Sequence, residues 1–420
     1  MVSAFFVFTN ENKMKKTFLM TLCLLLSLSS YAYDFKVNGY YYNILSITDR
    51  TAQLTCSGPS TIYGDGYDYN YDYKATYNGD LEGKFVVPKT VEYEGVTFTV
   101  TSINYLAFIN CVIGTLIVPE TILEAYINAE ATNEDYSMVG IWNLIVEDSE
   151  TPIMLYAPGI KNSVYLGRQP SNDDALSGGS YTKIEFGENV TRLNHMTCYE
   201  NTKLTSVTLP KSIKYLDCAF RGCSVLKTID APGVEIAFDA FLGCHKLETV
   251  NMPMLRYVGD SGFGNCTSLK SISFSPGLLI LGKTYHGGNV FEGCSNLESV
   301  VIPSTVVRIG REGYYYEGEY YYDEDSRVFA DCSSLKTITM CNPVPINLAE
   351  SNFAAMTYLT ATLKVPVGAA EAYRNADVWK NFVNIVEDVS ITDDIFTVAQ
   401  EENYSYGGSI EIEMEDALPA

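Results

Sequence analysis

The sequence predicts a β-rich solenoid, in which short strands stack coil upon coil. Two observations lead to this prediction: an apolar signature F-x-x-C-x-x-L-x-x-I recurs, and its regular copies are spaced by about 22 residues. One coil cannot bury its apolar side alone, so the copies are expected to stack. The predicted repeat core consists of Phe220, Cys223, Leu226, Phe241, Cys244, Leu247, Phe263, Cys266, Leu269, Phe291, Cys294, Leu297, Phe329, Cys332 and Leu335.

A short strand is expected after each Leu of the signature. Leu269, Ile272 and Phe274 are spaced so that they face inward, and a proline such as Pro303 then ends the strand because it cannot donate a ladder hydrogen bond. We expect these strands to form one parallel sheet along the solenoid. An apolar-Gly pair such as Val258-Gly259 follows in each coil.

The N-terminus has the pattern of a secretory signal peptide if the start is Met14. Lys15 and Lys16 precede a short apolar run, and Ser30-Tyr31-Ala32 is typical of a cleavage site before Tyr33. The apolar run is too short for a transmembrane helix, so we expect a secreted or cell-surface protein. The expected divisions are 1–32 signal peptide, 33–100 β-rich N-terminal cap, 101–200 irregular coils, 201–342 regular coils, 343–387 C-terminal cap with a helical stretch, and 388–420 acidic tail.

The cysteines favour a ladder of buried thiols over a disulfide framework. Five of them occupy one repeat position, and stacked coils place equivalent side chains in one buried column. Cys111 fits the same position. A bridge elsewhere, involving Cys198 or Cys218, stays open.

Charge argues against one class of partner and suggests a polar outer face. The formal net charge of −23 excludes the basic surface that nucleic acid requires. Two columns follow the conserved Leu: one with charges that alternate from coil to coil, and one of small hydroxyls, which is either a binding face or simple strand propensity. The columns are Thr205, Lys227, Glu248, Lys270, Glu298 and Lys336, and Ser206, Thr228, Thr249, Ser271, Ser299 and Thr337.

The pattern Phe-x-x-Cys-x-x-Leu-x-x-Ile-x-x-Pro followed by apolar-Gly resembles the BspA-like leucine-rich repeats of bacterial surface proteins. The resemblance covers most of the chain beyond residue 32, although the coils in 120–200 depart from the pattern. It implies a leucine-rich repeat solenoid, mainly β with short helical turns, flanked by a β-rich N-terminal cap and a small helical C-terminal cap. It also implies an exported location and adhesion to host or neighbouring-cell proteins. The family pattern contains no catalytic residue set.

Two tyrosine-rich, acidic segments interrupt the pattern, at 63–77 and 311–327. Tyrosine supplies a large, rigid contact area at little rotamer cost. We expect these segments to bind a basic protein or a glycan, with solvated low-complexity loops as the alternative. The candidate binding residues are Tyr67, Tyr69, Tyr71, Tyr314, Tyr315, Tyr316, Tyr320, Tyr321 and Tyr322.

Metal and catalytic motifs are weak. Asp68, Asn70 and Asp72 match only the first half of a calcium loop, and Tyr73 replaces the glycine that its sharp turn requires. The three histidines, His195, His245 and His286, lie in no catalytic motif, so we expect no enzyme, metal or cofactor. The sequence therefore predicts a non-enzymatic surface interaction protein, most simply an adhesin for protein or glycan. The alternative is a cell-envelope protein that self-assembles.

Overall fold

The computed structural model describes residues 33–56, 81–105, 107–108, 111–127, 140–282, 288–310, 314–316, 319–321 and 326–391. The chain divides into two compact units, Met1–Val164 and Tyr165–Ala420. The predicted signal segment 1–32 and the calcium-like residues 68–72 lie outside the described residues. The divisions predicted from the sequence at 100, 200, 342 and 387 stay predictions.

The first unit begins with a mixed sheet of order β1-β2-β3-β6-β8-β10, in which β5 also pairs with β6. The first three strands are antiparallel, whereas β3, β6, β8 and β10 pair in parallel. Aromatic rings fill its core, where Phe35 stacks on Tyr42 and Tyr93. The strands are β1 Phe35–Val37, β2 Tyr40–Ser46, β3 Thr51–Thr55, β5 Thr90–Tyr93, β6 Val96–Ile103, β8 Glu124–Tyr126 and β10 Met154–Tyr156.

Longer strands form the other sheet of this unit, in the order β11-β9-β7-β4, and β9, β7 and β4 pair in parallel. Ile113 lies opposite Ile141, Leu116 opposite Leu144, and both pairs are fully buried. Burial in β7 does not alternate strictly, since Leu116, Ile117 and Val118 are all buried. The strands are β4 Leu81–Val86, β7 Val112–Val118, β9 Gly140–Val146 and β11 Ile160–Arg168.

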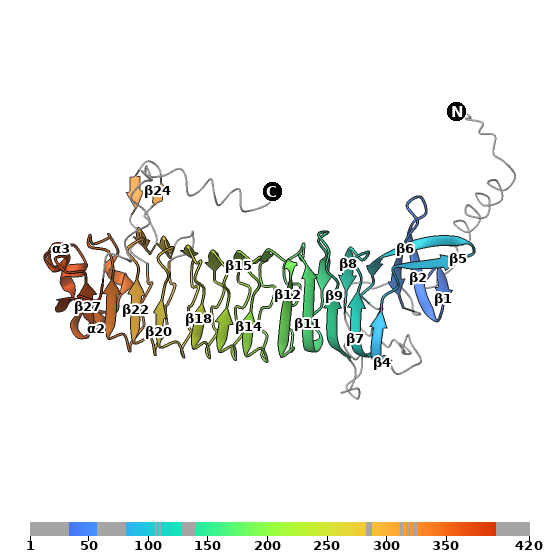
Figure 1. Ribbon diagram of the computed structural model, residues 1–420, viewed down its shortest axis with the longest axis horizontal. Coiled ribbons are helices and arrows are strands. Elements are labelled where there is room, and N and C mark those ends of the chain that lie inside the picture. Colours follow the sequence, from blue (N-terminus) through green and yellow to red (C-terminus); the bar gives the residue numbers. More distant parts are fainter. Residues whose placement is uncertain are drawn as a thin grey trace, which may run out of the picture. The chain divides into compact units, whose positions relative to one another are not determined.

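In the second unit, the repeat strands stack side by side from coil to coil (Figure 1). Their pairing is parallel, as expected, but the prediction of a single sheet is wrong. Strands β14-β16-β18 form one sheet and β20-β22-β26-β27-β28 another. The strands of these two sheets are β14 Ser206–Thr208, β16 Thr228–Asp230, β18 Thr249–Asn251, β20 Ser271–Ser273, β22 Ser299–Ile302, β26 Thr337–Met340, β27 Thr362–Val365 and β28 Asn384–Glu387; β12 Lys183–Asn189 precedes them in the chain and belongs to neither sheet.

A further sheet of the second unit comes from short segments that the sequence did not predict as strands, three of which precede the glycine of an apolar-Gly pair: β19, β21 and β23. Its order is β13-β15-β17-β19-β21-β23, with parallel pairing throughout. Each coil therefore contributes two strands, with an inward side chain such as Leu216 or Val258 from this side. The strands are β13 Arg192–Leu193, β15 Tyr215–Asp217, β17 Ile236–Phe238, β19 Tyr257–Val258, β21 Ile280–Leu281 and β23 Arg308–Ile309.

A column of stacked phenylalanines fills the coil interior. Neighbouring rings lie 5.2 to 5.9 Å apart between centroids and are tilted by at most 13°. Offset stacking of this kind adds to the free energy gained by burial. The column consists of Phe220, Phe241, Phe263, Phe291, Phe329 and Phe353, the last of which belongs to the C-terminal cap.

The repeat cysteines form a second interior column. Each of the ten cysteines in the described part of the chain is a buried free thiol, Cys198 and Cys218 included. The ladder thiols donate to a backbone carbonyl of the preceding coil: Cys244 Sγ lies 3.1 Å from Phe220 O, and Cys294 Sγ 3.0 Å from Phe263 O. Asn201 takes the thiol's place in an earlier coil, where its side-chain amide donates to Tyr181 O. The cysteines therefore join coils by hydrogen bonds.

The end of the second unit is a small helical cap, as predicted. Trp379 is fully buried there, and its indole N–H donates to Ile346 O at 2.7 Å. None of the described helices is long and apolar enough to cross a membrane. The helical segments are η1 Glu350–Asn352, α2 Ala355–Thr360, α3 Ala370–Asn375 and η2 Trp379–Asn381.

Candidate functional site

The outer face of the repeat strands presents the predicted hydroxyl column to solvent. Ser206 lies opposite Thr228, which lies opposite Thr249, and Ser271, Ser299 and Thr337 pair in the same way in the next sheet. Thr362 of β27 extends this second row. The column is interrupted once, between Thr249 and Ser271, because β18 and β20 belong to separate sheets.

The predicted charge column is only partly paired. Lys336 Nζ lies 3.3 Å from a Glu298 carboxylate oxygen, and both side chains are exposed. Lys227, Glu248 and Lys270 form no ion pair within the described ranges. A second alternating column, which the sequence reading missed, precedes β15, β17 and β19. It contains Lys214, Glu235 and Arg256, with 3.2 Å between the charged atoms of the first two.

In the tyrosine-rich insertion at 311–327, two short strands form an antiparallel pair. Strand β24 Tyr314–Tyr316 pairs antiparallel with β25 Glu319–Tyr321, so that Tyr314 lies opposite Tyr321 and Tyr315 opposite Tyr320. The two strands form a sheet of their own. Aromatic residues have a high propensity for strands, which agrees with the pairing of these two tyrosine-rich segments. Tyr322 and the other candidate binding residues, Tyr67, Tyr69 and Tyr71, lie outside the described residues.

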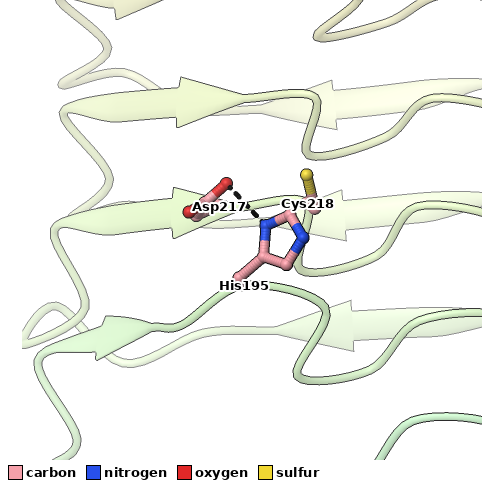
Figure 2. A group of neighbouring side chains, drawn as sticks. All are labelled: His195, Asp217 and Cys218. Atoms are coloured by element: carbon pink, nitrogen blue, oxygen red, sulfur yellow. Dashed lines mark hydrogen bonds and ion pairs between the residues drawn. The ribbon is translucent and has the colours of Figure 1, made fainter. Parts of the chain in front are cut away.

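A compact group of ionisable side chains lies where the strands of the sheet β13-β15-β17-β19 end, at their carboxyl ends. Figure 2 shows His195 reaching from its own coil to the next, where Asp217 ends β15 and Cys218 follows it. His195 Nδ1 lies 3.4 Å from Asp217 Oδ1. One nitrogen, one oxygen and one sulfur of these residues all lie within 4.8 Å of one another. We call these three residues the His-Asp-Cys cluster.

Two more carboxylates lie near the His-Asp-Cys cluster. Asp239 directly follows β17, and Asp260 follows β19. Burial, and then the negative charges of Asp260 and Asp217, raise the pKa of Asp239 to about 6, against the opposing effect of Arg221. Several carboxylates therefore gather at the carboxyl ends of these strands, and burial partly shields them from water.

The same surroundings make Cys218 a poor nucleophile. Burial, and then the negative charges of Asp217 and Asp239, raise the pKa of its thiol to about 12. A nucleophilic cysteine needs a lowered pKa, because the thiolate is the reactive form. The three side chains of a Cys-His-Asp triad thus lie close together, but the thiol lacks the lowered pKa that a nucleophile needs. The cluster instead presents one nitrogen, one oxygen and one sulfur atom as possible metal donors.

The other Cys-His neighbours have no such geometry. Cys244 Sγ is buried in the thiol column, whereas His245 is exposed and its Nδ1 lies 3.0 Å from Asn265 O. The two side chains therefore point to different sides of the backbone. His286 lies outside the described residues.

Sequence reasoning missed the His-Asp-Cys cluster although a signal was present. His195 and Asp217 are separated by 22 residues, which is one coil. In a solenoid such a separation places two residues side by side. Searching for metal-ligand residues one coil apart would have found the cluster.

The comparisons with known proteins agree with the fold. A family model described as the BspA type leucine-rich repeat region matches residues 195–320 in six copies. No curated protein matches the chain.

Several solved structures are similar to this chain. A leucine-rich repeat protein from Bacteroides ovatus is 21% identical, with 81% of this chain and 80% of that chain covered and a TM-score of 0.47. A leucine rich cell surface protein from Faecalibacterium prausnitzii is 18% identical, with 85% and 96% covered and a TM-score of 0.31. The pneumococcal vaccine antigen PcpA is 16% identical, with 84% and 98% covered and a TM-score of 0.32. The six matched copies and the stacked coils together show that residues 195–320 form a leucine-rich repeat region of the BspA type.

Proposed function

We propose that this protein is an exported, non-enzymatic interaction protein that binds a protein or glycan at a cell surface. The observation that carries the proposal is the contrast between the inside and the outside of the coils. The interior is filled by fully buried Phe and Cys columns, so it has no part in binding. Contact with another molecule is left to the outer surface.

The outer face of the repeat strands suits such contact. Strands fixed by parallel pairing hold the hydroxyls of Ser271, Ser299 and Thr337 in a row. Hydroxyl groups both donate and accept hydrogen bonds, so one row can pair with the polar groups of a protein or the hydroxyls of a sugar. A rigid row also loses little conformational entropy on binding.

The β24–β25 hairpin is the second element of the proposed surface. It lies in the connection between β23 and the coil that begins at Phe329, where the repeat permits an insertion. Its sequence combines Tyr with acidic residues, and Tyr is enriched where proteins contact their ligands. We propose that the hairpin supplies specificity and the strand face supplies area.

Surface location is part of the same proposal. It is supported by the BspA type of the repeat and by the signal-like segment at 14–32. Mass spectrometry of the protein recovered from the producing cells provides the measurement. Detection of a mature N-terminus at Tyr33 in the envelope or medium is expected, whereas an unprocessed chain retained in the cytoplasm would contradict export.

The binding test is an array of glycans and matrix proteins probed with residues 33–420. Three variants accompany it: a double variant Ser271→Arg and Ser299→Arg on the strand face, a deletion of 312–326, and a control, Val307→Arg. Val307 is exposed, but it lies just before β23, which belongs to a different sheet from the strands of Ser271 and Ser299. Loss of a bound ligand in the first two variants, with binding intact in Val307→Arg, is expected. A folded chain that binds nothing, or equal binding by all variants, overturns the proposal.

A further inference from the structure

We propose that the His-Asp-Cys cluster is a binding site for one divalent transition-metal ion of the zinc class, bound by His195 Nδ1, Asp217 and Cys218 Sγ. The site would join two neighbouring coils of the second unit. It is independent of the surface contact proposed above, since it lies on the other sheet.

The donor atoms fit the size of such an ion. Zinc binds nitrogen and carboxylate oxygen at about 2.0–2.2 Å and sulfur at about 2.3 Å, in tetrahedral geometry. Two such N and O ligands then stand roughly 3.4 Å apart. His195 Nδ1 and Asp217 Oδ1 stand at 3.4 Å. All three donors lie within 4.8 Å of one another, so one ion can reach all three after side-chain adjustment.

The chemistry of the donors selects the class of metal. Calcium and magnesium take oxygen ligands almost entirely. An imidazole together with a thiolate favours zinc and its neighbours among the transition metals. The cluster is therefore more than a group of carboxylates, because two of its three donors are ligands that hard cations avoid.

The backbone holds the donors in place. Met196 N–H donates to Asp217 O at 3.2 Å and thereby ties the coil of His195 to that of Asp217. Cys218 N–H donates to Phe238 O of the following coil at 2.9 Å. Donors fixed on paired strands and their adjoining turns lose little freedom when a metal binds.

The surrounding charge also favours a cation. Asp239 and Asp260 add carboxylates beside Asp217, and Arg221 is the cation that acts against them at Asp239. A bound divalent ion would offset this partly buried negative charge, which water screens poorly.

Binding requires one proton to leave. The Cys218 thiol gives its proton to the solvent, the resulting thiolate binds the metal, and no electron is transferred. Three protein ligands leave the fourth tetrahedral position to a water molecule. Because the thiol has a raised pKa, the metal must displace a firmly held proton, and calorimetry should detect this release as a buffer-dependent heat.

The test uses residues 33–420, freed of metal, and titrates zinc by calorimetry and cobalt by absorption spectroscopy. One ion per chain is expected, and cobalt should give the near-ultraviolet band of a thiolate ligand. Cys218→Ser should abolish that band, and His195→Ala should weaken zinc binding by more than about 100-fold, the upper limit for losing an outer-shell partner.

Two variants serve as matched controls. Cys341→Ser removes another buried non-repeat thiol, and His245→Ala removes an exposed histidine. Both should bind zinc and cobalt as the parent chain does. Circular dichroism establishes that every variant is folded. The absence of a thiolate band in the parent chain, or an unchanged zinc affinity in folded Cys218→Ser, overturns the proposal.

Discussion

The two units stack their coils by different means. In the first unit β7 and β9 are seven residues long and pair in register from Val112 to Val118. From β13 onward the strands of the second unit have only two to four residues, as in β18 and β20. Its coils are joined instead by the stacked phenylalanines and by thiols that donate to carbonyl groups of the preceding coil.

This difference shows where each unit obtains its cooperativity. Long strands distribute the coupling between coils over many backbone hydrogen bonds, so the side chains inside need only be apolar and of suitable size. Short strands provide few such bonds, and the coupling then depends on particular side chains. Changes to the Phe and Cys columns should therefore affect the second unit more than equivalent changes affect the first.

Alkaline pH should have the largest effect, and it should unfold the second unit first. Burial raises the pKa of Cys244 and of Cys294 from 9.0 to about 12. Between these values the unfolded chain has lost thiol protons that the folded chain retains. The free energy of unfolding therefore falls as pH rises, by about 1.4 kcal/mol per pH unit for each such thiol.

Hydrogen exchange followed by mass spectrometry, in reducing buffer, measures the alkaline effect separately in each unit. Above pH 9, peptides from the thiol column should lose protection before peptides from β7 and β9. In Cys294→Ala, the free energy of unfolding should fall less steeply with pH, by the contribution of one thiol, about 1.4 kcal/mol per pH unit. An unchanged slope in this variant would mean that the ladder thiols do not govern alkaline unfolding.

Phe263→Ala should have the next largest effect. Phe263 is fully buried and lies between Phe241 and Phe291, at centroid distances of 5.4 and 5.3 Å. Truncation of a buried Phe costs about 3–5 kcal/mol, because it leaves a cavity and removes two stacking contacts. Urea unfolding measures the loss. Phe238→Ala is the matched control, since Phe238 is only half-buried and lies outside the column. An equal loss in both variants would refute the special role of the column.

Cys266→Ala should cost less, about 1–2 kcal/mol, since one modest hydrogen bond and one sulfur atom are lost. Cys266 Sγ donates to Phe241 O at 3.3 Å, and that carbonyl retains the backbone N–H of Cys244 as a second partner. The acceptor is therefore not left unsatisfied. Urea unfolding of Cys266→Ala and of Cys266→Ser separates packing from hydrogen bonding. A gain in stability in either variant would contradict the coupling that we assign to the thiols.

Much of this architecture could be predicted because the interior repeats. A Phe, a Cys and a Leu at fixed spacing must face one core if coils stack, and Phe263, Cys266 and Leu269 are all buried. The C-terminal cap extended the column unexpectedly. Phe353 stacks on Phe329 at 5.2 Å although no F-x-x-C signature surrounds it.

The remaining features depend on pairing that the signature does not encode. The sheet β13-β15-β17-β19-β21-β23 has strands as short as Tyr257–Val258. Such strands are too short to show a periodic pattern in the sequence. The separation of β18 from β20 leaves no mark that we can identify, and we have no physical account of it. The His-Asp-Cys cluster was missed because its members belong to neighbouring coils and to no motif.

Lys336→Glu should have the smallest effect, and it determines how much the outer charge column adds to the interior columns. The Lys336–Glu298 pair is exposed, with 71% and 52% of the two side chains accessible. Surface pairs are worth about 0.2–1 kcal/mol, and like charges on neighbouring strands cost a similar amount. The loss measured in urea should shrink in 1 M salt, which screens exposed charges. Lys246→Glu, in an exposed turn, is the control and should change stability less. A loss as large as that of Cys266→Ala would place the coupling between these coils on the outer face as well as in the interior.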